Sequence, residues 1–178
     1  MGISRMTRWA LAAPLVALAA VVTGAAPPAG GPAAGNWTAS KLVTDIHSID
    51  QMEVTMGQLA QQKGSTARVR RYGSLLARDH RLADQQLISL ARDQHLGVAA
   101  TGMSLADRAK MTRLQGLSGR AFDRQFMADM KAGHDQAIAM LKASRGQLVN
   151  PSVRDFVGKL IPILNQHRDL AQHLEGKA

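Results

Sequence analysis

Three histidines and one glutamate stand at positions where the chain otherwise places apolar side chains at helical spacing. They are Glu53, His80, His134 and His167, one in each of four helix-like segments. Imidazole nitrogens and carboxylate oxygens are ligands for iron, manganese, copper and zinc. Their position on faces expected to be buried raises the hypothesis of a metal or redox site.

The spacing along the chain places these groups at similar depth. Glu53 and His80 are centred on the first turn expected between helices, and His134 and His167 are centred on the second. The two members of each pair then differ in depth along the antiparallel helices by about three residues, roughly 4.5 Å of helix rise. Whether the two pairs share one level depends on the connection between the hairpins, which the sequence leaves open.

The chain lacks the pattern of a ferritin-type di-metal site. Such a site uses one Glu from each of two helices and Glu-x-x-His from each of the other two. The residues three positions before the histidines are Ala77, Lys131 and Leu164. A mononuclear site of three His and one Glu stays open, and four aspartates are reserve ligands: Asp50, Asp79, Asp123 and Asp129.

The same groups also have a structural interpretation, in which they hydrogen-bond across the core and fix helix register. Glu53 is then the expected partner of His80, with Asp84 as a local alternative. Asp79 is not, because adjacent helical residues do not face each other. We expect no cofactor on this interpretation, and iron, manganese, copper or zinc on the other. The chain has nine methionines, whose thioether sulfur suits copper, but helical spacing predicts first a role in filling the core for Met52, Met56, Met127, Met130 and Met140.

Four long helices are expected to position these groups. Asn150 followed by Pro151 begins the last of them, and a capping box at Ser104 and Asp107 predicts a short helix inside the longest connection. The four long helices are expected at about residues 40–63, 66–95, 118–146 and 150–176. Two hairpins joined by one long crossover are typical of the all-α, ferritin-like four-helix bundle.

Apolar residues define the face of each helix that is expected to be buried. This face includes Ile49 in the first long helix and Ile163 in the last. His47, His95 and His173 lie off these faces or at helix ends. We expect these three histidines at the surface.

Residues 1–25 have the pattern of a secretory signal peptide. Arg5 and Arg8 precede an apolar run of signal length, which ends in small residues. We expect cleavage near residue 25, whereas a retained segment would anchor the protein in the membrane. Residues 26–39, rich in Pro, Gly and Ala, are expected to form a flexible tether to a helical domain at 40–176. The expected location is the periplasm or the outer envelope.

The composition restricts the possible partners. The 178 residues contain no cysteine, which excludes disulfides and thiolate metal sites, and the formal net charge is +9. A basic surface favours anionic envelope components, such as phospholipid headgroups and polysaccharides, or acidic envelope proteins. Aromatic residues make up only 3% of the chain, and with the expected export this argues against nucleic acid. The sequence leaves the oligomeric state open.

The sequence contains none of three common catalytic motifs: the Gly-x-Ser-x-Gly elbow, a Gly-rich phosphate loop and His-Glu-x-x-His. It leaves enzymatic activity open and favours a non-enzymatic envelope protein that acts through binding or stress protection. The alternative is a metal-binding redox or metal-storage protein that uses the buried Glu and His residues.

Three runs of residues resemble the bacterial domain-of-unknown-function family four-one-four-two. They are EVTMGQLAQQKGSTARVRRYGSLLARDHRLADQQLISLA, LSGRAFDRQFMADMKAGHDQAIAML and LIPILNQHRDLAQHL, and together they cover about residues 42–175. Ile161 stands where the family motif has Leu before Pro. The resemblance implies an exported, ferritin-like four-helix bundle and implies neither an activity nor a metal. The matching positions are Glu53, Asp79, His80, Phe122, Asp123, His134, Pro162 and His167.

Overall fold

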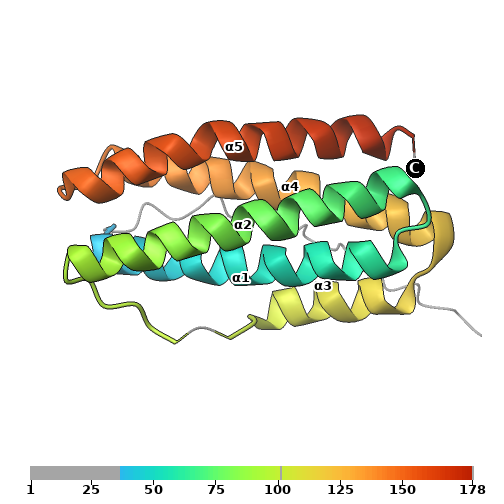
Figure 1. The fold of residues 1–178 in the computed structure, drawn as a ribbon, viewed down its shortest axis with the longest axis horizontal. Helices are drawn as coiled ribbons and strands as arrows, with labels where there is room; N and C mark the ends of the chain where they lie inside the picture. The colour runs from blue at the N-terminus through green and yellow to red at the C-terminus, as the bar shows by residue number, and fades with distance from the viewer. Residues whose placement is uncertain (1–36, 101, 178) are drawn as a thin grey trace, which may run out of the picture. The chain divides into compact units, whose positions relative to one another are not determined.

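The computed structural model describes residues 37–100 and 102–177, and in these ranges the chain forms helices and no strand. The helices are α1 (Ala39–Lys63), α2 (Ala67–Asp93), α3 (Leu105–Gly116), α4 (Gly119–Arg145) and α5 (Pro151–Glu175) (Figure 1). The expected all-α fold is confirmed. The expected signal segment lies outside the described residues, as do residues 26–36 of the expected tether. Within the described ranges, no helix combines the length and apolar character needed to cross a membrane.

Side-chain caps fix where most of the helices begin. Four N-cap residues each accept a hydrogen bond from the backbone N–H three residues further on: Thr38, Thr66, Ser104 and Asn150. Each cap satisfies one of the N–H groups that a helix start leaves unpaired. Ser118, the N-cap residue of α4, makes no such side-chain bond.

The four long helices form two hairpins that pack against each other. α1 packs along α2 and α4 packs along α5, while α2 also contacts α5 and α1 contacts α4 (Figure 1). The short helix α3 lies in the connection between the hairpins and contacts α1 and α4. Side chains from α1, α2, α4 and α5 can therefore meet in one interior.

The two helices of the first hairpin approach each other backbone to backbone at Gly57 and Gly73. A Cβ atom on Gly57 would lie 2.5 Å from the carbonyl oxygen of Gly73, and a Cβ atom on Gly73 would lie 2.6 Å from the carbonyl oxygen of Gly57. Only glycine allows this approach. It fixes α1 against α2 one turn from Glu53 and two turns from His80.

Two apolar clusters fill the interior. Along each of the four long helices, buried polar side chains lie between the residues of one cluster and those of the other. In α1, Ile46 belongs to the first cluster and Met56 belongs to the second. Six buried polar residues occupy the intervening positions. One of them, Asp84, contacts His47. We call the other five the polar layer: Asp50, Glu53, His80, His134 and His167. Burying this many polar groups is costly unless each one finds a partner.

The buried faces of α1 and α5 are rotated by about one residue from the expected faces. In α1, Asp50 is buried and Ile49 is only half-buried. In α5, Leu164 is buried while Ile163 is 40% exposed. The expectations for Ile49 and Ile163 were wrong for two reasons. Apolar spacing assigns an aspartate such as Asp50 to the exposed face, even where it is buried. It also cannot decide which of two adjacent apolar residues, Ile163 or Leu164, faces the core.

Asp123 of α4 is fully buried and holds the start of α2. Its Oδ1 atom accepts a hydrogen bond from the backbone N–H of Ser65 at 2.8 Å. Its Oδ2 atom accepts from the Ser65 hydroxyl at 2.5 Å and from the backbone N–H of Thr66 at 3.2 Å. This carboxylate therefore links the second hairpin to the first and lies outside the polar layer.

Replacing Asp123 by alanine is expected to lower the free energy of unfolding by about 2–3 kcal/mol, because three donors lose a charged acceptor. Asp123→Asn keeps one acceptor oxygen and should cost less. Urea denaturation of the three proteins measures the difference. Equal midpoints for the wild type and Asp123→Ala would show that these bonds contribute no stability.

Candidate metal centre

His80 of α2, His134 of α4 and His167 of α5 form a trihistidine cluster within the polar layer. Each residue is at most 3% exposed. The ring centroids are 5.8 Å apart for His80 and His134 and 5.4 Å apart for the other two pairs. One ring nitrogen of each histidine lies within 4.8 Å of one ring nitrogen of each of the others. The two hairpins thus place their histidines at one level.

A partner outside the cluster holds one nitrogen of His134 and one of His167. Nδ1 of His134 donates to the backbone carbonyl oxygen of Met130, 2.8 Å away. Nε2 of His167 lies 3.1 Å from Oδ2 of Asp79. Asp79 therefore faces His167 across the α2–α5 contact. As expected, it is not the partner of His80, its neighbour in sequence.

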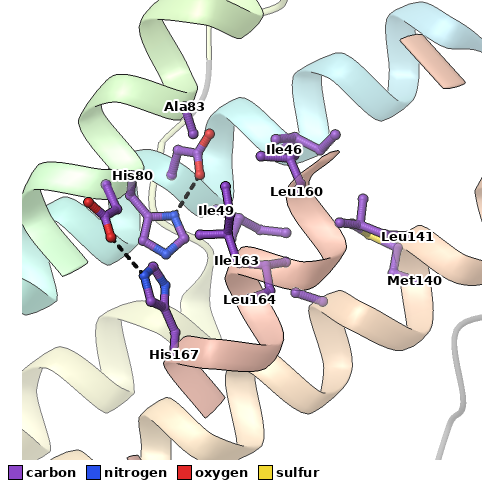
Figure 2. Close-up of a pocket in the computed structure, with 13 residues that line it drawn as sticks. Ile46, Ile49, His80, Ala83, Met140, Leu141, Leu160, Ile163, Leu164 and His167 are labelled. Atoms are coloured by element: carbon purple, nitrogen blue, oxygen red, sulfur yellow. Dashed lines mark hydrogen bonds and ion pairs between the residues drawn. The ribbon is translucent and has the colours of Figure 1, made fainter. Parts of the chain in front are cut away.

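The third histidine, His80, is held by Asp50 of α1. Its Nδ1 atom lies 2.7 Å from Oδ1 of Asp50 (Figure 2). The expectation that Glu53 is the hydrogen-bond partner of His80 was wrong, because the rotated buried face of α1 brings Asp50 to this position. The signal in the sequence was the spacing of Asp50 with Ile46 and Glu53, four and three residues apart.

The remaining nitrogen of each ring is buried and has no hydrogen-bond partner in the described part of the chain. These atoms are Nε2 of His80, Nε2 of His134 and Nδ1 of His167. Because a carbonyl oxygen can only accept, neutral His134 carries its proton on Nδ1 and a lone pair on Nε2. One unpaired buried polar atom costs about 1–3 kcal/mol. Three such nitrogens at one place require an explanation beyond packing.

Burial favours the neutral form of the His80 and His167 rings. It lowers the pKa of His80, and it lowers the pKa of His167 to about 4. Burial alone would raise the pKa of Asp79, but its hydrogen bonds to His167 and Arg78 bring that pKa below the ordinary value. Asp79 is therefore ionised and accepts the proton of Nε2, which leaves the lone pair of His167 on Nδ1.

Two buried carboxyl groups from α1 border the cluster. Burial, and then the nearby charge of Asp84, raise the pKa of Asp50 well above its ordinary value. Glu53 is 8% exposed, and its Oε2 atom is buried without a partner in the described part of the chain. Its Oε1 atom lies toward α4, 3.7 Å from the position that a Cβ atom on Gly133 would take. Glu53 adjoins the cluster, but the close group consists of the three histidines alone.

Asp84 and His47 form a separate polar contact between α1 and α2. Oδ1 of Asp84 lies 2.5 Å from Nδ1 of His47, and Oδ2 accepts from the Gln51 side chain at 2.6 Å. The expectations that Asp84 is a local partner of His80 and that His47 is a surface residue were wrong. Asp84 points across to α1, and the His47 side chain is only 21% exposed.

The remaining candidates lie away from the cluster. Asp129 binds Arg113 of α3 through both carboxylate oxygens at 2.8 Å. This ion pair connects α3 to α4. His95 and His173 are exposed, as expected.

A small cavity of about 40 Å³ lies beside His80 and His167. Figure 2 shows the two rings at one end of the cavity and apolar side chains around the rest. Its apolar walls include Ile46, Met140 and Leu160. A cavity of this volume has room for water. The edge of the cluster is therefore not packed completely by protein atoms.

Comparison with known proteins places this helical domain in a family. The family model described as Domain of unknown function (DUF4142) matches residues 24–174. The chain belongs to the DUF4142 family. The family description assigns no function, and none of the curated proteins compared with the chain matches it.

Two solved structures show the same helical fold as this DUF4142 chain. CopM in its Cu(II)-bound form has a TM-score of 0.70 at 16% identity, over 80% of this chain and 99% of CopM. A DUF305 protein from Streptomyces coelicolor, described as secreted, has a TM-score of 0.69 at 16% identity, over 79% of this chain and 93% of that protein. At these identities the likeness concerns the fold.

Acid is expected to destabilise the metal-free protein between about pH 6.5 and pH 4. Folded His167 takes up a proton only near pH 4, whereas in the unfolded chain it does so near 6.5. The unfolded state therefore binds more protons in this window. Stability that is complete above pH 6.5 falls as the pH falls, by about 3 kcal/mol for this residue.

Urea denaturation in EDTA, comparing the wild type with His167→Gln at each pH, measures this contribution. Asp50, with its raised pKa, makes a contribution to stability that changes with pH in the opposite direction. Because both proteins contain Asp50, this contribution largely cancels in the comparison. The free-energy difference between the two proteins should change by about 3 kcal/mol from pH 7 to pH 4. Parallel stability curves would contradict the prediction.

Proposed function

We propose that this protein binds a transition-metal ion at the trihistidine cluster and serves in metal binding or metal storage. Two observations carry the proposal. One ring nitrogen of each histidine lies within 4.8 Å of one ring nitrogen of each of the others, and each ring has one buried nitrogen without a hydrogen-bond partner in the described part of the chain. A histidine that binds a metal usually donates its other N–H to a carboxylate or a backbone carbonyl. Asp50, Asp79 and the Met130 carbonyl are suitably placed for this role.

The donor set fits a borderline transition-metal ion. Imidazole suits zinc, copper, iron and nickel, and the carboxyl groups of Asp50 and Glu53 lie beside the rings. Nitrogens that share one tetrahedral zinc ion are about 3.3 Å apart. The three rings would therefore turn inward on binding. Zinc(II) and copper(II) are the first ions to test.

The structural neighbours support a role that involves metal. CopM has been solved with Cu(II), with Cu(I) and with silver bound. Those structures share 14–16% identity with this chain, so we transfer no binding residue from them. The proposal for this chain depends on its own histidines.

We also propose that the domain is ferritin-like and that the protein is exported to the periplasm or the outer envelope. Two hairpins joined by a long connection that contains α3 support the first proposal. The signal-like pattern of residues 1–25 supports the second. The net charge of +9 favours anionic envelope components as neighbours. Cell fractionation with N-terminal sequencing tests the location and the cleavage.

Thermal melting of the untagged protein tests metal binding. An ion that binds only the folded state at 100 times its Kd adds about 2.7 kcal/mol of stability. We expect zinc(II) or copper(II) to raise Tm by several degrees and EDTA to reverse the shift. A Tm that no transition-metal ion changes would contradict the proposal.

A further inference from the structure

We propose that Asp50 and Glu53 make the trihistidine centre selective for divalent over monovalent metal ions. This inference depends on the proposed metal binding and specifies the charge of the ion that the site prefers. The two residues lie on one face of α1, three positions apart, and both belong to the polar layer. The selectivity follows from the charges that the interior holds around the three imidazoles.

The two carboxyl groups are buried and incompletely paired. Asp50 is 3% exposed and Glu53 is 8% exposed. Oδ2 of Asp50 and Oε2 of Glu53 are buried and have no hydrogen-bond partner among the described residues. In the described part of the chain, lysines and arginines form ion pairs with other carboxyl groups, such as Asp79 and Asp129. A cation in the polar layer would supply the missing opposite charge.

Charge balance then favours an ion of charge two. The three imidazoles are neutral ligands and compensate none of the charge of the ion. The carboxyl groups of Asp50 and Glu53 can supply up to two negative charges beside the ion, which balance a divalent ion, whereas a monovalent ion can balance only one of them. Asp79, the third nearby carboxylate, also pairs with Arg78 at 2.8 Å and has an exposed edge.

The chemistry of the donors points in the same direction. Soft monovalent ions such as Cu(I) and Ag(I) favour thioether and thiolate sulfur. The chain has no cysteine. Met130, the methionine joined to the cluster by a hydrogen bond, contributes its backbone carbonyl to His134. The close group itself offers imidazole nitrogen.

Comparing the affinities for Zn²⁺ and Ag⁺ tests this inference, because both ions keep their oxidation state under ordinary conditions. Isothermal titration of the untagged wild type, Glu53→Gln and Asp50→Asn with each ion measures the two affinities. Both substitutions keep the side-chain shape and remove one negative charge. Asp129→Asn is the matched control, since Asp129 pairs with Arg113 away from the layer. Circular dichroism checks that each variant is folded.

We expect the wild type to bind Zn²⁺ more tightly than Ag⁺. Glu53→Gln and Asp50→Asn should each weaken Zn²⁺ binding by about 10–100-fold and change Ag⁺ binding by much less, while Asp129→Asn changes neither. Three results would overturn the proposed selectivity but not the proposed metal binding. They are an equal loss of Zn²⁺ and Ag⁺ affinity in the variants, unchanged Zn²⁺ affinity in both variants, and equal affinities of the wild type for Ag⁺ and Zn²⁺. The comparison within the wild type holds even if a variant does not fold. A wild type that binds neither ion would overturn the proposed metal binding as well.

Discussion

His134→Leu is expected to abolish metal binding without destabilising the metal-free protein. The substitution removes the unpartnered Nε2 atom of His134 and leaves two imidazoles, too few to hold an ion tightly in the interior. It also removes a buried polar atom whose missing partner costs about 1–3 kcal/mol. The affinity for zinc(II) or copper(II) should fall by more than 100-fold. The free energy of unfolding in EDTA should stay constant or rise by about 1 kcal/mol.

This pair of results separates the two interpretations of the buried histidines. If the cluster served only to fix helix register, His134→Leu would destabilise the metal-free protein and have no effect on metal. His173→Leu is the control, because His173 is exposed on α5. Titration calorimetry gives the affinity, and urea denaturation in EDTA gives the stability. Unchanged affinity in His134→Leu would remove His134 from the proposed site.

Gly57→Ala is expected to lower the free energy of unfolding by about 3 kcal/mol. The added Cβ atom would lie 2.5 Å from the carbonyl oxygen of Gly73 and 2.9 Å from the backbone nitrogen of Ala77. Both atoms belong to the backbone of α2, so α1 and α2 must move apart, and overpacking of this kind is costly. The better helix propensity of alanine recovers only about 1 kcal/mol.

Gly133→Ala is the matched control within a helix. A Cβ atom there meets Glu53 at 3.7 Å, an ordinary contact. This substitution should be neutral or stabilising by up to about 1 kcal/mol. Thermal or urea denaturation compares the two variants with the wild type. A Gly57→Ala protein as stable as the wild type would show that the approach of α1 to α2 relaxes easily.

The sequence predicted the helices and most of the polar layer because both depend on local patterns. Capping residues at Ser104 and Asn150 have the predicted effect. The helical spacing of apolar residues placed Glu53 and the three histidines on buried faces, where the structure has them.

The residues that hold the histidines were less predictable, because they depend on how helices rotate against one another. From the sequence, Asp50 was only a reserve ligand, because the helical spacing of apolar residues places Ile49 on the buried face. The close approach at Gly57 and Gly73 sets the rotation of α1, and it depends on contacts between two helices. The level of the second hairpin against the first depends on the connection that includes α3, and no local pattern encodes it.

The separate roles of the aspartates show the same limit. Asp123, Asp84 and Asp129 all lie on helices of the domain, and each binds a partner far away in sequence. Asp79 and Asp50 adjoin the histidines for the same reason. A sequence lists these carboxylates, but their partners follow only from the packing of the helices.

The metal content of the untagged protein is the most direct test of the proposed metal centre. The protein, its His134→Leu variant and a variant with His80, His134 and His167 all replaced by leucine are incubated with zinc(II) or copper(II), dialysed and measured by elemental analysis. We predict close to one ion per chain in the wild type and close to none in both variants. No bound ion in the wild type, or equal metal content in all three proteins, would contradict the trihistidine site.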